Sequence, residues 1–178
     1  MISYDTLARM AREAGFSAWS PLKPDTIVCR SEVRDMCAGN TCGQYGKRWS
    51  CPPGCGSLEE CARRLEECTY GILVQTIGEL EDEFDGEAMM ETEALHKENF
   101  QRMLSALREK EDHVLALGAG CCTRCKVCTY PDAPCRFPEE AVSSMEAYGL
   151  LVLQVCRDNG LSYYYGSDKI AYTGCFLL

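Results

Sequence analysis

The chain has 178 residues, 46% of them hydrophobic and 25% charged, which suits one soluble globular domain spanning residues 1–178. The net charge of −9 argues against binding nucleic acid or an anionic membrane surface, because both require clustered Lys and Arg. The start of the chain lacks a signal-peptide pattern and no apolar stretch is long enough to span a bilayer, so we expect a cytoplasmic protein. In a reducing compartment, its fourteen cysteines indicate metal binding rather than disulfides.

The first part of the chain predicts two helices, a short strand and a loop. Apolar spacing predicts a helix over residues 3–14, and "TIVC" at 26–29 predicts a short strand. Residues 37–56 are predicted to form a loop, because they contain five glycines and two adjacent prolines. A capping box at Ser57–Glu60 then begins a helix, and Cys61 falls on its apolar face.

The middle of the chain predicts a βαβ unit. Residues 70–77 are apolar and β-branched, which predicts a buried strand. A long amphipathic helix follows over about 89–110, and residues 113–120 predict a second core strand. Strand, helix and strand in this order favour two parallel strands in one sheet.

A second cysteine-rich loop, residues 121–138, follows that strand. Beyond it, Ser143–Glu146 reads as another capping box before a helix that ends at Asn159–Gly160. The tail predicts a hairpin that turns at 166–168. The predicted fold is therefore α+β or α/β, a small central sheet with flanking helices, a βαβ unit and two cysteine-rich metal-binding loops.

The second loop carries the more specific metal signal. Cys122, Cys125 and Cys128 follow one another at two-residue intervals, and Cys135 is the candidate fourth ligand. Three closely spaced cysteines with a more distant fourth are typical of [4Fe-4S] ligation, whereas structural zinc sites usually combine two separate Cys-x-x-Cys pairs. Zinc remains the alternative, and Cys121 is left as a spare thiol because its neighbour already faces the predicted centre.

The first loop offers four candidate ligands, Cys37, Cys42, Cys51 and Cys55. The fourth ligand is open: Cys55 is nearest in sequence, and Cys61 is the rival although its helical spacing indicates a core position. If Cys55 is the fourth ligand, the first loop holds a second cluster with no open iron, which only transfers electrons or stabilises the loop. A centre held by three thiolates would instead leave one iron open to substrate.

The motifs "VRDMCAGNTCGQYGKRWSCPP" and "CCTRCKVCTYPDAPCRFPEEAVSSMEAYGL" resemble a family of predicted metal-binding proteins, a domain of unknown function found mostly in anaerobic bacteria and archaea. The resemblance extends over nearly the whole chain. It implies metal binding at these positions: Cys37, Cys42, Cys51, Cys122, Cys125, Cys128 and Cys135. It implies no particular reaction.

The remaining candidates receive structural interpretations. Cys29, Cys68, Cys156 and Cys175 lie in apolar periodic contexts, which predict core positions. His96 and His113 are expected at surface or capping positions. "LALGAGCC" at 115–122 places G-x-G after a strand, but it lacks the third glycine of a dinucleotide-binding motif.

The leading hypothesis is an iron–sulfur protein with one or two [4Fe-4S] clusters that transfers electrons to a partner redox enzyme. Whether the protein is itself an enzyme stays open. The alternatives are a redox enzyme with an open iron in the first loop, and a zinc-stabilised binding module.

Overall fold

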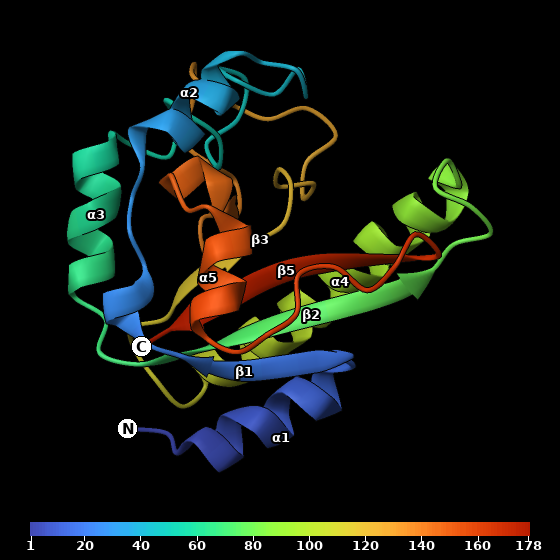
Figure 1. Cartoon of the computed structure of the whole chain (residues 1–178). Coiled ribbons are helices and arrows are strands. Elements are labelled where there is room, and N and C mark those ends of the chain that lie inside the picture. Colours follow the sequence, from blue (N-terminus) through green and yellow to red (C-terminus); the bar gives the residue numbers. More distant parts are fainter.

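A five-stranded mixed sheet lies at the centre of the computed structural model, which describes residues 1–178 (Figure 1). The strands are β1 (Ala18–Leu22), β2 (Gly71–Glu79), β3 (Leu115–Gly118), β4 (Ser143–Ser144) and β5 (Lys169–Leu177). The helices are α1 (Tyr4–Ala14), α2 (Ser31–Ala38), α3 (Leu58–Glu66), α4 (Gly86–Arg108) and α5 (Val152–Asp158), with 3-10 turns η1 (Pro24–Thr26) and η2 (Glu146–Tyr148). This α+β arrangement agrees with the predicted fold class.

The strand order is β1-β2-β5-β3-β4. β2 pairs antiparallel with β1 and β5, β5 pairs antiparallel with β3, and β3 pairs parallel with β4. Strands β2 and β3, which α4 connects, therefore run in the same direction within one sheet, as the βαβ pattern predicted. They are not neighbours, because the C-terminal strand β5 lies between them.

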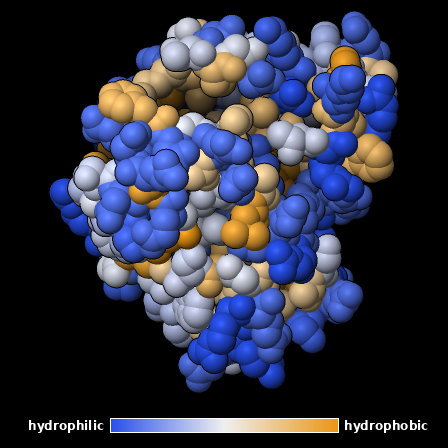
Figure 2. Space-filling view, turned by 90° about the vertical axis from the view of Figure 1, so that its right-hand side faces the viewer, coloured by the Kyte–Doolittle hydropathy of each residue, from blue (hydrophilic) through white to orange (hydrophobic).

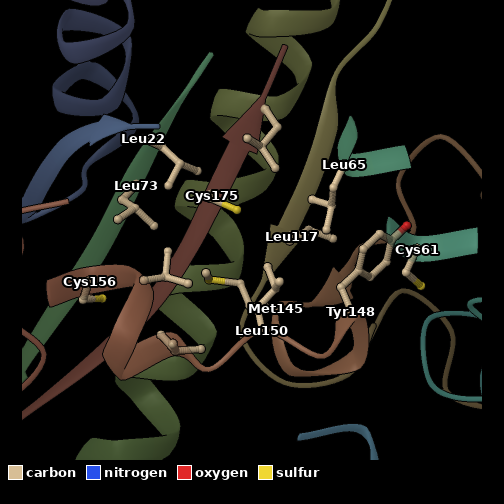
Figure 3. Packing of buried hydrophobic residues seen from close by; sticks show 13 residues of the cluster. Leu22, Cys61, Leu65, Leu73, Leu117, Met145, Tyr148, Leu150, Cys156 and Cys175 are labelled. Carbon is tan, nitrogen blue, oxygen red and sulfur yellow. The ribbon is translucent and has the colours of Figure 1, made fainter. Parts of the chain in front are cut away.

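Alternating side chains of the sheet build a core on each face, because successive residues of a strand point to opposite sides. On one face, Ile72, Val74 and Phe176 pack against α1 and α4. On the other face, Leu73, Cys175 and Leu177 pack in a cluster that includes residues of α3, η2 and α5 (Figure 3). This second cluster contains every buried core cysteine outside the two loops, namely Cys61, Cys156 and Cys175.

Local signals set the helix ends. The Ser57 hydroxyl accepts from the Glu60 N–H and the Glu60 carboxylate accepts from the Ser57 N–H, so the predicted capping box is confirmed. The Asp85 carboxylate caps α4 by accepting from the Ala88 N–H. Helix α1 ends at Gly15, whose φ of 100° lies in the left-handed region that favours glycine.

Three sequence expectations are wrong. The strand predicted at 26–29 is absent, since only Cys29 forms an isolated bridge, and β1 lies earlier at Ala18–Leu22. Ser143 does not cap a helix, because Ser143–Ser144 pairs with β3 as β4. The tail forms no hairpin, because β5 takes partners on both sides from β2 and β3.

Figure 2 shows a surface that is mostly hydrophilic, with hydrophobic residues beside a hollow in the upper part of this side. None of the helices combines the length and apolar character needed to cross a bilayer.

Candidate metal centre

The four candidate cysteines of the second loop, Cys122, Cys125, Cys128 and Cys135, line one small cavity. The segment follows β3 as irregular backbone, so its side chains are not restricted to a helical or extended spacing. All four side chains are partly buried and carry free thiols. The structure therefore brings the predicted ligands of the second loop around a common space.

The first loop forms a wall of that cavity, through Arg48, Trp49 and Ser50. Arg48 Nη1 donates to the Cys122 carbonyl at 2.9 Å, and the Cys122 N–H donates to the Ser50 hydroxyl at 3.1 Å. Two hydrogen bonds thus fix Cys122 to residues more than seventy positions earlier in the chain.

Trp49 makes the second connection between the loops. Its indole N–H donates to the Ala133 carbonyl at 3.1 Å. Its ring lies edge-on to Tyr130, with 4.9 Å between the ring centroids. An aromatic pair of this geometry contributes about 0.5–1.5 kcal/mol beyond the area it buries. The two loops consequently form one cysteine-rich region.

The thiol of Cys128 is set apart from the other loop cysteines by its electrostatics. Burial raises its pKa, but the backbone N–H groups of Tyr130 and Trp49 and the Arg48 guanidinium outweigh burial and leave the pKa below its usual value. Because the thiolate is the metal-binding form, these donors favour the state that ligation requires.

The first-loop thiols are more dispersed. Cys37, at the end of α2, lies 3.9 Å through its Sγ from the Glu146 carbonyl oxygen, whereas Cys42 is exposed. Burial, with Glu146 and Cys42 nearby, raises the pKa of Cys37. Burial also raises the pKa of Cys51 to about 11, and both Cys42 and Cys121 lie near enough to add to that rise. Burial therefore favours the protonated form of Cys37 and Cys51.

Cys55 and Cys61 form a buried pair at the base of the first loop. Cys55 Sγ is 3.7 Å from the Ala147 carbonyl oxygen. Cys61 has no exposed surface and packs beside Tyr148 at one end of the core cluster (Figure 3). The core position predicted for Cys61 is confirmed.

Arg34 gives Cys61 a polar contact that the helical pattern did not indicate. Hydrogen bonding from Cys55, together with a bond from Arg34 Nη1 at 3.6 Å, lowers the pKa of Cys61. Arg34 also donates to the carbonyls of Ala147 and Gly56. The guanidinium therefore ties α2 to the end of the first loop and stabilises a thiolate in the Cys55–Cys61 pair.

The cysteine side chains suit a metal centre that prefers sulfur ligands. The two loops do not, however, surround one common point. No three Cys, His, Asp or Glu side chains in the structure are arranged to hold an ion. The cavity among the four second-loop cysteines measures about 20 Å³, close to the ~10–15 Å³ that one water needs. Thiolates suit iron–sulfur clusters and zinc alike. Binding of a multi-iron centre requires the irregular backbone of the loop to rearrange around it.

A family comparison matches residues 20–178 to DUF2284, described as predicted metal-binding protein. The chain belongs to this family. The matched region contains both cysteine-rich loops and all five strands except the first two residues of β1. A metal-binding domain is thus supported by the family and by the cysteine chemistry together. No curated protein and no solved structure matches the chain.

Other sequence expectations near the site have mixed outcomes. Cys156 and Cys175 are buried, which confirms their core positions, whereas Cys29 and Cys68 are only partly buried at the edge of the same cluster. His96 is only 1% exposed, so its predicted surface or capping position is wrong. Arg48, Trp49 and Arg34 were not identified from the sequence, because their partners are distant along the chain and no local motif marks them.

Proposed function

We propose that this protein is an iron–sulfur protein, with one [4Fe-4S] cluster in each cysteine-rich loop, that passes single electrons to a partner redox enzyme in the cytoplasm. The observation that carries the proposal is the docking of the two loops. Four second-loop thiols line one cavity whose wall is residues 48–50 of the first loop. Such docking supports two centres side by side.

The protein's own groups suit a redox site. When bound, a [4Fe-4S] cluster supplies a one-electron couple, and the surrounding charge and hydrogen bonds set its potential. Around Cys128, two backbone N–H groups and the Arg48 guanidinium stabilise negative charge on sulfur. Donors of this kind raise the reduction potential, because they favour the more negative reduced state.

Contact between the loops supports electron transfer from one to the other. Cys121, next to the ligand candidate Cys122, lies close enough for its charge to raise the pKa of Cys51 in the first loop. The second loop also reaches the surface, where Val127 is 73% exposed. A partner protein could therefore approach the second centre without opening the fold.

Anaerobic purification followed by iron and acid-labile sulfide analysis tests the proposal. We expect iron and sulfide in equal amounts, a brown protein, and an EPR signal after reduction by dithionite. A colourless protein that contains only zinc would contradict it. Zinc analysis of the same sample tests the zinc-stabilised binding module directly, because thiolates bind zinc as well as iron–sulfur clusters.

The second candidate function is a redox enzyme with an open iron in the first loop. The favouring observation is that Cys55 is buried against Cys61 and the Ala147 carbonyl, apart from the exposed Cys42. If only Cys37, Cys42 and Cys51 are ligands, Cys55→Ala should retain the full iron content. Loss of the first cluster in that variant would show that Cys55 closes the site. Cys51→Ala is the matched variant that loses the cluster under either hypothesis.

A further inference from the structure

A second, larger cavity lies beside the metal-binding region. It measures about 780 Å³, within the range of roughly 300–1,000 Å³ that small-molecule sites occupy. One wall is α4, and the other is the segment from Gly118 to Arg124 that leaves β3. Cys122 and Arg124 line this cavity and the small cysteine cavity as well. The two cavities therefore adjoin.

A buried histidine on the lining of this cavity lacks one hydrogen-bond partner. His96 Nδ1 lies 3.1 Å from the Thr76 hydroxyl, while Nε2 has no partner. Burial, with a smaller effect of Lys97, lowers the pKa of His96 to about 4. The ring is therefore neutral at pH 7, with a single N–H.

A chain of hydrogen bonds determines which nitrogen carries that proton. Arg102 can only donate, so its 2.7 Å bond to Asn99 Oδ1 fixes the amide orientation. Asn99 Nδ2 then donates to the Thr76 hydroxyl oxygen at 3.2 Å. The Thr76 proton is left with His96 Nδ1 as its only acceptor. Nε2 accordingly carries the histidine proton and is a buried donor with no acceptor.

Further donors gather on the same lining. Lys97 and Arg102 project from α4, and Arg124 comes from the opposite wall. The backbone N–H groups of residues 119–121 donate to no acceptor within the chain. These groups belong to the G-x-G segment that the sequence singled out. Lys97 pairs with Glu93, Arg124 pairs with Glu140 and Arg102 donates to Asn99, so these backbone N–H groups are the donors left for the acceptor atoms of a ligand.

A carboxylate already fits among these donors. Glu93 pairs with Lys97, and its Oε1 would lie 2.9 Å from a Cβ added at Gly120. Glycine at position 120 therefore allows a carboxylate to approach the backbone closely. Phe100 and Val142 give the cavity an apolar surface next to this polar end.

We propose that this cavity binds a small organic carboxylate, with its anionic group at Lys97 and the backbone of residues 119–121 and its apolar body against Phe100 and Val142. Glu93 occupies the anion position when the cavity is free and gives way to the ligand. The groups assigned to the ligand include none of the candidate metal ligands. Its position next to Cys122 places the ligand beside the metal-binding region.

Isothermal titration of the anaerobically purified full-length protein with 2-naphthoate tests this site, with 2-naphthamide as the neutral isostere. We expect 2-naphthoate to bind with a Kd below about 1 mM and the amide to bind about tenfold more weakly, since charge-assisted hydrogen bonds are roughly twice as strong as neutral ones. Equal affinity of acid and amide, or no binding of either, would overturn the proposal. Inorganic phosphate that binds more tightly than 2-naphthoate would overturn the carboxylate assignment.

Charge variants on α4 locate the anion. Lys97→Gln should weaken 2-naphthoate binding about tenfold, and Glu93→Gln should strengthen it by about threefold, because the competing carboxylate is lost. Glu91→Gln removes the same charge from an exposed residue that does not line the cavity, so it should change affinity little. Equal effects of Glu93→Gln and Glu91→Gln on the affinity for 2-naphthoate would show that only long-range charge acts on the ligand. That result would overturn the proposed site. Metal analysis of each sample separates the two proposals, because a zinc-only protein that binds 2-naphthoate contradicts the proposed function alone.

Discussion

In the loop over residues 121–138, four partly buried thiols face one cavity, whereas in the loop over residues 37–56 the thiols range from the exposed Cys42 to the buried Cys55. Hydrogen-bond donors lower the pKa of Cys128 in the second loop, while burial raises the pKa values of Cys37 and Cys51 in the first. Cysteine density alone therefore does not prepare a metal site. The surrounding backbone decides whether the thiols converge and ionise.

The largest expected effect comes from removing one second-loop ligand. Cys125→Ser should abolish the second centre and lower the iron content per chain by about half, because three thiolates hold a cluster less securely than four. Iron and sulfide analysis measures the loss. Cys121→Ser is the matched control, since Cys121 does not line the small cavity, and it should retain all iron. Equal loss of iron in both variants would contradict the assignment of Cys125 as a ligand and Cys121 as a spare thiol.

Alkylation of the metal-free protein should separate the loops by reactivity. At pH 8, iodoacetamide should modify Cys128 at least about tenfold faster than Cys51, because the thiolate is the nucleophile and the pKa of Cys51 is raised to about 11. Raising the pH toward 11 should bring the two modification rates closer together, since Cys51 then ionises. Peptide mass spectrometry gives both rates. Faster modification of Cys51 than of Cys128 at pH 8 would contradict the expected difference in thiol reactivity between the two loops.

The docking between the loops should matter more to the second centre than to the fold. Trp49→Leu removes the hydrogen bond to Ala133 and the edge-on contact with Tyr130. A loss of about 1 kcal/mol would speed metal release to a chelator roughly fivefold. Trp19→Leu on β1 serves as the control, because it lies outside both loops. Similar release rates in the two variants would mean that the docking does not hold the metal.

At the buried pair beneath the first loop, we expect an effect on the fold and none on the metal content. Cys61→Ala should lower the free energy of unfolding by about 1–2 kcal/mol, because a fully buried side chain leaves a small cavity and Arg34 loses a partner. Denaturant unfolding measures the change, and the iron content should stay the same. Loss of iron would instead identify Cys61 as a ligand of the first centre.

Local patterns in the sequence predicted several features that the structure confirms. The Ser57–Glu60 capping box, the amphipathic α1 and α4, and the common direction of β2 and β3 all follow from residues close together in the chain. The sequence predictions failed where segments distant in the chain compete to pair with the same strand. β5 accepts β2 and β3 as neighbours instead of folding back on residues 161–165, because two core strands bury more apolar surface than a hairpin in the tail would.

His96 shows the same limit in a single side chain. Its sequence neighbours are Leu95 and Lys97, which give no sign of burial. It is buried because α4 packs on the sheet, where Thr76 of β2 supplies a hydroxyl partner. Only the register between helix and strand could reveal that contact.

The sequence predicted thiol ligands and their spacing, because the Cys-x2-Cys-x2-Cys run and the glycine- and proline-rich loop are properties of short segments. The tertiary structure alone decided that Arg48, Trp49 and Ser50 wall the second cysteine cavity and that Arg34 contacts Cys61. These contacts join residues 27 to 84 positions apart, so no local pattern in the sequence indicates them. Such contacts form only when the sheet brings both loops to the same side of the molecule.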